Sequence, residues 1–449
     1  MAEEKKTQQQ SAVKEKELQK ETIAKYGGFA LLETTVDGLQ NMNPERKARR
    51  NIFLTEDGKK DERDNLAQRL NLWIDILKNN DEAASMVEAC NEKTSKIDTT
   101  LRENISKALE VTKELETNYR SVNLFYKNAE AKKIKNISIL NADSDQITDL
   151  DTSLALNIVG EELGANYDRL DLKDNYSMLV LPGYLGSKKV VDAWAREAYK
   201  NKTMLLTDYR DLDSVDDVVE LFEEANLTGG DGYLSNVIMS CNYLVGRERD
   251  DEYGEEDGVF VPPSTSMAGK LYTTLMSQIS AGRSFGSLND VDGVKFPLKK
   301  SEISHLDKIG LVPMVNEYGK VMAFSGKTLF NGDNIGMKTY SVVRVFDYIS
   351  KVLVDFLNRR AFENWNANTK KDLRKQIIGF LDSVKGPKGL IEKWEIRKLD
   401  QDPIDKDKIN LDIHIKPYFP AKTFLVQLEG TKGEDIEEIT WESDYAMQG

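Results

Sequence analysis

The pentapeptide Gly282–Gly286 places Ser284 in the G-x-S-x-G spacing of a nucleophile elbow. In that motif a buried strand precedes the serine and a helix follows it, so that the hydroxyl is exposed on a strained turn and can attack a carbonyl. His305 and His414 are the two histidines that could act as its general base. A serine hydrolase is therefore one hypothesis, although the pattern before Ser284 is helical and the segment after it is rich in turn residues.

Two further segments are close to known ligand-binding loops, but neither fits. The segment 324–328 (FSGKT) resembles the end of a phosphate-binding loop, yet Val321 stands where that loop requires glycine. The segment 288–293 (LNDVDG) resembles the start of a calcium loop, yet Leu288 occupies the first ligand position and Lys299 the twelfth. Two histidines also cannot form a histidine-rich metal site. The sequence thus predicts no cofactor, no metal and no enzymatic activity.

Composition limits the partners and the location of the protein. The 449 residues include 62 Lys plus Arg and 76 Asp plus Glu, a net charge of −14, which argues against nucleic acid or an anionic membrane as a partner. The first twenty residues lack the apolar core of a signal peptide, and no run of about 18 apolar residues occurs, so we expect a cytoplasmic protein with no membrane span. Cys90 and Cys241 are expected to be reduced thiols.

The first half of the chain predicts a polar arm, a helical region and an α/β domain. Residues 1–62 form the expected arm, in which the run 29–36 (FALLETTV) has the composition of a short strand. Residues 63–130 carry apolar side chains at helical spacing and predict two or three helices. In residues 131–245 short apolar runs alternate with amphipathic stretches, which predicts parallel strands joined by crossover helices. The expected strands are 135–140, 176–183 and 203–209, and the expected helices are 187–200 and 214–225.

The second half predicts a separate domain. Residues 246–258 are almost wholly charged or glycine, so this acidic loop is the expected domain boundary. Within residues 259–430 we expect a terminal β-hairpin, in which 410–416 pairs with 422–429, and residues 431–449 are an expected tail. The predicted fold class is mixed α/β. The expected helices of the second half are near 267–279, at 341–360 and at 369–383.

Four blocks of the second half, in the same order, resemble the contractile tail sheath family, which includes phage tail sheaths and the large sheath subunit of bacterial type VI secretion systems (TssC/VipB). The order of the blocks makes this resemblance specific, because each block alone is a weak match. In the first half, 118–126 (NYRSVNLFY) resembles a diverged Trp-Arg-Gly-Leu segment of type VI large subunits, with Tyr119 and Ser121 in place of Trp and Gly. The blocks are 259–274 (VFVPPSTSMAGKLYTT), 306–330, 340–390 and 409–428.

The resemblance implies a structural protein that polymerises around an inner tube and contracts to propel the tube through a membrane. The sheath of a phage tail or of an extracellular contractile particle is the alternative within the family. The implied partners are a small sheath subunit (TssB/VipA-like), an inner tube protein (Hcp-like), further copies in stacked hexameric rings, a baseplate on a membrane and, in many systems, a recycling ATPase. We expect the helices of residues 63–130 to bind the small subunit.

The resemblance also implies exchange of strands between subunits, because an exposed sheet edge can pair with another chain. The expected donor residues are Phe29, Leu31, Leu32 and Val36, and the expected acceptor residues are Leu411, Ile413, Ile415, Phe424, Val426 and Leu428. A second expected surface is a basic cluster within a chain of net negative charge, and we expect it to contact the inner tube. This cluster consists of Lys370, Lys371, Arg374 and Lys375.

Overall fold

The computed structural model describes residues 54–55, 57–130, 134, 136–172, 175–255, 257–422, 424–431 and 439–447. The described residues fall into two compact units. The first comprises the residues up to Glu110 together with Glu252–Gly254, and the second comprises Val111–Asp251 and the residues from Glu255 onward. In the part of the chain that the structure describes, no helix is both long and apolar enough to cross a membrane.

The helical region consists of two helices, α4 (Lys60–Asn79) and α5 (Ala83–Asn128), after a single 3-10 turn, η3 (Asp57–Lys59). This confirms the prediction of two or three helices from an amphipathic stretch that contains neither glycine nor proline. Helix α5 is 46 residues long. It begins in the first unit and ends in the second, where Leu124 is buried.

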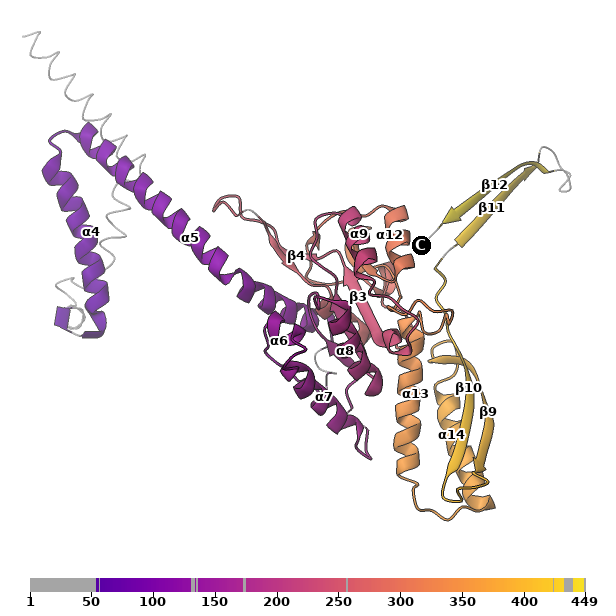
Figure 1. Cartoon of the computed structure of the whole chain (residues 1–449). Coiled ribbons are helices and arrows are strands. Elements are labelled where there is room, and N and C mark those ends of the chain that lie inside the picture. Colours follow the sequence, from indigo (N-terminus) through magenta and orange to yellow (C-terminus); the bar gives the residue numbers. More distant parts are fainter. Residues whose placement is uncertain are drawn as a thin grey trace, which may run out of the picture. The chain divides into compact units, whose positions relative to one another are not determined.

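A five-stranded sheet forms the centre of the second unit, in the order β1-β2-β3-β7-β8, and its middle strand β3 is labelled in Figure 1. Strands β1 (Met178–Val180), β2 (Met204–Asp208), β3 (Val237–Cys241) and β7 (Val312–Glu317) pair in parallel. Strand β8 (Lys320–Ala323) pairs antiparallel with β7. Helices α8 (Lys188–Lys200), α9 (Val215–Ala225) and α12 (Lys300–Ile309) lie between the strands in sequence. The predicted α/β layer is therefore confirmed.

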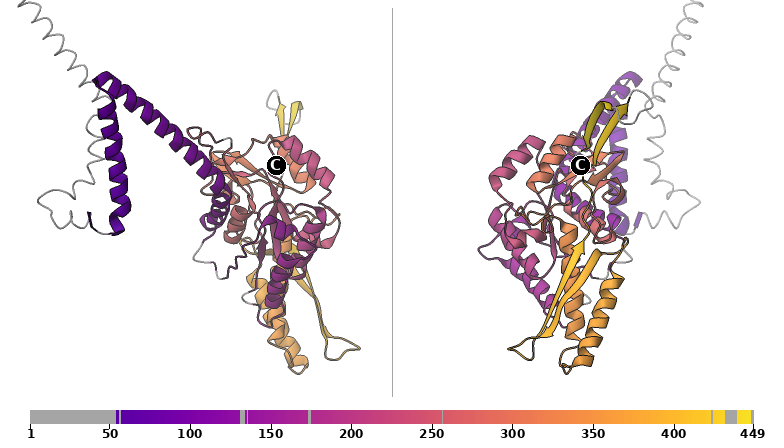
Figure 2. Two further views of the ribbon diagram at one scale, coloured as in Figure 1. Left: turned by 60° about the vertical axis from the view of Figure 1, so that its left-hand side comes forward. Right: turned by 90° about the vertical axis from the view of Figure 1, so that its right-hand side faces the viewer.

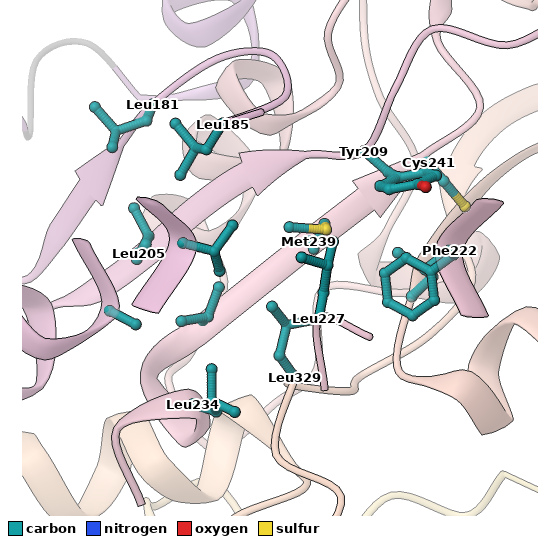
Figure 3. Close-up of a cluster of buried hydrophobic side chains, with 14 of the residues drawn as sticks. Leu181, Leu185, Leu205, Tyr209, Phe222, Leu227, Leu234, Met239, Cys241 and Leu329 are labelled. Carbon is teal, nitrogen blue, oxygen red and sulfur yellow. The ribbon is translucent and has the colours of Figure 1, made fainter. Parts of the chain in front are cut away.

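Each face of this sheet supports its own apolar core, because successive side chains of a strand point to opposite faces. Leu205 and Met239 belong to a core with Phe222 of α9 (Figure 3). Trp194 of α8 is part of the same core. Leu206 and Ile238, each one residue away, belong to the other core. Strand β2 is buried on both faces and reads as a continuous apolar run in the sequence, which is how it was predicted, whereas the equally buried β3 was not predicted.

The second core brings the end of α5 against α10 (Ser264–Thr273) and the start of α13 (Tyr340–Asn358). Gly269 of α10 allows this contact, because a Cβ at that position would lie 2.5 Å from the carbonyl oxygen of Phe125 and 3.0 Å from the amide nitrogen of Ala129. Those two groups are backbone atoms of α5 or of the residue that follows it, so they cannot move aside as a side chain would. A glycine is therefore needed where the two helices approach each other.

A third core lies in the C-terminal part of the second unit. It consists of α13, α14 (Ala367–Ser383), β9 (Ile391–Gln401) and β10 (Ile409–Pro417), with α13 and α14 on one side of the β9–β10 ribbon (Figures 1 and 2). The predicted helices 341–360 and 369–383 are confirmed within two residues at each end. The remaining elements are α6 (Ser144–Thr148), α7 (Leu154–Tyr167), η5 (Gly232–Asn236), β4 (Leu244–Arg247), β5 (Val259–Val261), α11 (Gly282–Phe285), β6 (Gly293–Val294), β11 (Phe424–Thr431) and β12 (Ile439–Met447).

The predicted hairpin between 410–416 and 422–429 is wrong. Strand β10 pairs antiparallel with β9, and β11 pairs antiparallel with β12 in the expected tail. The turn that closes the β9–β10 ribbon is built around Asp402, whose amide donates to the carbonyl oxygen of Lys408 (2.7 Å) and whose carboxylate accepts from the amides of Ile404 and Asp405. Sequence analysis overlooked this aspartate turn and therefore also strand β9.

Three other expectations need correction. The segment 135–140 was expected to be a strand, but residues 136–140 lie in no strand, and Ile137, Ile139 and Leu140 are exposed. The acidic loop 246–258 is not a domain boundary, because β4 and β5 on its two sides pair with each other within one core. The helix expected near 267–279 ends at Thr273.

Candidate assembly surfaces

The serine hydrolase hypothesis does not fit the local structure. Ser284 is exposed in α11, a helix of four residues that no strand immediately precedes, so the strand, turn and helix of a nucleophile elbow are not formed. His305 is exposed on α12, where its Nε2 lies 3.8 Å from Oε1 of Glu223, and His414 is exposed on β10. Among the described residues, no group of three His, Cys, Asp or Glu side chains could hold a metal ion.

The expected acceptor residues for strand exchange lie on two separate ribbons. Leu411, Ile413 and Ile415 of β10 are half-buried against α13 and α14. Phe424, Val426 and Leu428 lie on β11, in register with Met447, Tyr445 and Ser443 of β12. Within the described residues each ribbon has two strands, so each keeps two outer edges. The expected donor residues Phe29, Leu31, Leu32 and Val36 lie outside the described residues.

The expected basic cluster lies near the start of α14. The side chain of Asn366 caps this helix and accepts hydrogen bonds from the amides of Asn368 and Thr369. Lys370 forms an ion pair with Asp400 of β9, so its charge is compensated locally. The other three members, Lys371, Arg374 and Lys375, are exposed.

An apolar stripe, which sequence analysis did not single out, follows one face of α5 within the second unit. Its members recur at intervals of three and four residues, so they align along one side of the helix. Leu124 and Asn128, on the opposite side of the helix, are buried. The stripe is formed by Val111, Leu115, Tyr119, Val122 and Tyr126, with exposed fractions of 74%, 70%, 69%, 43% and 39%.

Ion pairs also fasten this part of α5 to the β4–β5 hairpin. Glu116 Oε1 accepts from Arg120 Nε (2.8 Å) and from Arg247 Nε (3.1 Å), and Arg120 Nη1 donates to the carbonyl oxygen of Gly246 (2.6 Å). Arg247 also holds Glu255, and this hydrogen bond lowers the pKa of Glu255 to about 2. Because the inner side of α5 is fixed in this way, the apolar stripe stays accessible to another chain.

A buried polar junction that was not predicted from the sequence lies at Asp208, the last residue of β2. Asp208 Oδ1 accepts from the amide of Ser264 (2.8 Å) and from Ser240 Oγ. Its Oδ2 accepts from the amide of Gly183 (2.9 Å) and from Ser264 Oγ (2.5 Å). Burial raises the pKa of Asp208 to about 6 despite these hydrogen bonds. The carboxylate thus joins the loop after β1, the end of β3 and the start of α10. A carboxylate directly after an apolar strand was the available signal.

Comparison with known proteins identifies the family. Models of the TssC/VipB-like N-terminal region, the type VI secretion system TssC/VipB central domain and the TssC/VipB-like C-terminal domain match residues 16–105, 107–331 and 339–447. The chain belongs to the TssC/VipB family. This confirms the resemblance predicted from the sequence blocks, and the type VI description favours that branch over the phage and extracellular alternatives.

Individual relatives are distant from this TssC/VipB-family chain. The tail sheath protein of Vibrio phage KVP40 is 23% identical over 201 residues, which are 42% of this chain and 30% of the phage protein. The chain thus matches less than a third of that relative's length. Structures of the anti-feeding prophage baseplate and of its contracted helical sheath each align with 70% of the chain, at 16% and 17% identity, over 80% and 81% of the aligned chains and with TM-scores of 0.48 and 0.49.

Proposed function

We propose that this TssC/VipB-family chain is a structural subunit of a type VI contractile sheath, which polymerises around an inner tube and contracts to propel the tube through a membrane. The observation that carries the proposal is the match of three consecutive TssC/VipB models between residues 16 and 447. The two ribbons with open edges support it, because such edges suit pairing with neighbouring subunits. In this proposal the chain is not an enzyme, and it acts in the cytoplasm on a membrane-anchored baseplate.

The proposed mechanism is a transition between two packed lattices and not a chemical reaction. Subunits assemble in an extended lattice and then slide into a shorter and wider one of lower free energy. Interfaces of packed side chains tend to have discrete arrangements, so the change can occur in one cooperative step. A gain of about a few kcal/mol per subunit, comparable with other allosteric transitions, is multiplied over all the subunits of a sheath.

The apolar stripe of α5 is the surface that we assign to the small sheath subunit. Five large apolar side chains in a row on one helix are unusual on a surface that remains in water, and their spacing is that of a seam between two helices. We therefore expect the partner to contribute a helix with its own apolar stripe. The further proposed partners are the tube protein, further copies of this chain, the baseplate and a recycling ATPase.

Polymerisation tests the proposal. The chain, purified together with a small sheath subunit from the same gene cluster, is expected to form tubules that are visible by electron microscopy. The Ser284→Ala variant should form the same tubules, because the proposal gives the serine hydroxyl no role. Soluble particles of fixed small size, or hydrolase activity that disappears in the Ser284→Ala variant, would contradict it.

The exposed part of the basic cluster leads to a prediction about the inner tube. The variant Lys371→Glu/Arg374→Glu should produce at least about tenfold fewer tube-filled sheaths while the subunit stays folded, because these side chains are exposed and contribute little to the core. The measurement is the fraction of tube-filled sheaths in electron micrographs, with circular dichroism as the test of folding. The control, Lys189→Glu/Lys320→Glu, changes the same charge at exposed positions on α8 and β8. Equal filling by the variant and the wild type would exclude this contact.

A further inference from the structure

The short linker between β10 and β11 forms part of the wall of a cleft in the second unit. Its residues Pro420, Ala421 and Lys422 form part of the lining of this cleft, whose volume is about 570 Å³. Pro420 and Lys422 are half-buried there. Apolar side chains from three parts of the chain form much of the remaining wall, namely Ile279, Leu298, Ile303, Val315 and Phe324. The linker therefore borders an apolar cleft, and its half-buried residues Pro420 and Lys422 contact the rest of the unit.

One ion pair fixes the linker at the end nearest to β11. Lys422 Nζ lies 2.9 Å from Asp307 Oδ1, and the side chains are 34% and 17% exposed. Ser325 Oγ donates to the same carboxylate oxygen at 2.6 Å, so the carboxylate is held in place before the lysine approaches. Asp307 lies in the last turn of α12, next to the fully buried Leu306. The lysine is thus attached to a rigid part of the fold.

We propose that Lys422 and Asp307 form a releasable latch that sets the direction in which the β11–β12 ribbon leaves the subunit. This inference rests on the proposed sheath function, because a subunit that moves within a lattice must redirect a ribbon that it shares with a neighbour. Lys422 lies two residues before Phe424, the first residue of β11. When Lys422 is bound to Asp307 the ribbon starts from a fixed point, and when Lys422 is released residues 418–422 can turn.

A second cation, Lys327, lowers the free-energy cost of releasing Lys422 from Asp307. Lys327 interacts electrostatically with both Asp307 and Lys422. Burial lowers the pKa of Lys327, the charge of Asp307 raises it, and the charge of Lys422 lowers it further. When Lys422 leaves, Asp307 keeps its hydrogen bond from Ser325 and remains in the field of Lys327. A carboxylate that loses its only partner inside a protein is strongly destabilising, and Lys327 avoids that situation here. The latch can therefore open without unfolding the site.

The test measures the direction of the ribbon in the unassembled subunit, so its outcome does not depend on sheath formation. Spin labels are attached to Ser301→Cys on α12 and Ser443→Cys on β12, in a Cys90→Ser background that leaves only the buried Cys241. Double electron–electron resonance on the full chain, purified with its small partner, then gives the distance distribution. The wild-type latch should give one dominant distance. Lys422→Glu should lower the ratio of this population to the others by roughly fivefold, the size expected for a partly exposed ion pair.

Charge-reversal variants distinguish loss of the Lys422–Asp307 ion pair from a general disturbance of the fold. Asp307→Lys should broaden the distribution as Lys422→Glu does, and the double variant Lys422→Glu/Asp307→Lys should recover most of the dominant population. The matched control is Lys416→Glu, which breaks an ion pair with Glu392 only six residues earlier in the chain and should leave the distribution unchanged. An unchanged distribution in Lys422→Glu, or a double variant as broad as the single ones, would overturn the proposal.

Discussion

Replacing Leu115 and Tyr119 by glutamate is expected to abolish binding of the small sheath subunit. Both side chains lie in the apolar stripe of α5, about 70% exposed, and contact with another chain would bury them. Large apolar side chains at the centre of an interface commonly contribute about 2 kcal/mol or more each, so the double variant should bind at least about a hundredfold more weakly. The measurement is co-purification of the two proteins after co-expression, followed by titration of the separated partners.

The control for this prediction is Lys113→Glu, an exposed position on another side of the same helix. It adds negative charge without touching the stripe, so binding should be retained. The double variant should keep its helix content, because both substituted side chains are exposed and the ion pairs of Glu116 with Arg120 and Arg247 remain. Wild-type affinity in the double variant would show that the small subunit binds elsewhere.

Asp208→Ala is expected to produce a large loss of stability. The substitution leaves the buried amides of Gly183 and Ser264 without an acceptor, and each such group costs about 1–3 kcal/mol. The free energy of unfolding should therefore fall by roughly 2–5 kcal/mol, measured as a lower thermal midpoint of the co-purified protein. Asp216→Ala, at an exposed aspartate of α9, is the matched control and should change little. Equal midpoints of the two variants would refute the role of this junction.

The same carboxylate predicts a dependence of stability on pH. The pKa of Asp208 is about 6 in the folded chain, against an ordinary value of 3.8 for this side chain. Between these values the folded state binds more protons than the unfolded state, so the free energy of unfolding contributed by this group falls as pH rises from about 4 to about 6. In Asp208→Asn this contribution is removed. The difference in thermal midpoint between wild type and Asp208→Asn should therefore be larger near pH 4.5 than near pH 7.

Strands β1 and β2 and several helices were predicted from the sequence because they show as local patterns, whereas β3, β7 and β8 of the central sheet were not predicted. Strand β2 is buried on both faces and therefore reads as an uninterrupted apolar run, and the amphipathic helix α13 reads as a regular spacing of three and four. The family was predicted correctly for a related reason. One of the four blocks, 259–274, is largely buried, and its Gly269 approaches α5 at a point where few residue types fit.

The pairing of the C-terminal strands could not be predicted in the same way. Strand pairing is set by contacts between segments that are distant in sequence, and the apolar residues of β9 recur at intervals of two and three, without the strict alternation that indicates a strand. The deciding feature is the turn around Asp402, which brings β9 and β10 together. The helices of residues 63–130 were expected to bind the small subunit, but the apolar stripe itself was not predicted, since helical spacing does not show by itself which side of a helix is left exposed.

The most direct test of the sheath proposal is the lattice itself. Cryo-electron microscopy of the tubules formed by this chain with its small partner and tube protein should show two helical lattices, one extended around a tube and one shorter, wider and empty. Conversion of the first into the second should occur on triggering without any added nucleotide, because the energy is stored in the packing of the subunits. A single lattice whose rise and diameter never change, or a conversion that requires nucleotide hydrolysis, would contradict the account.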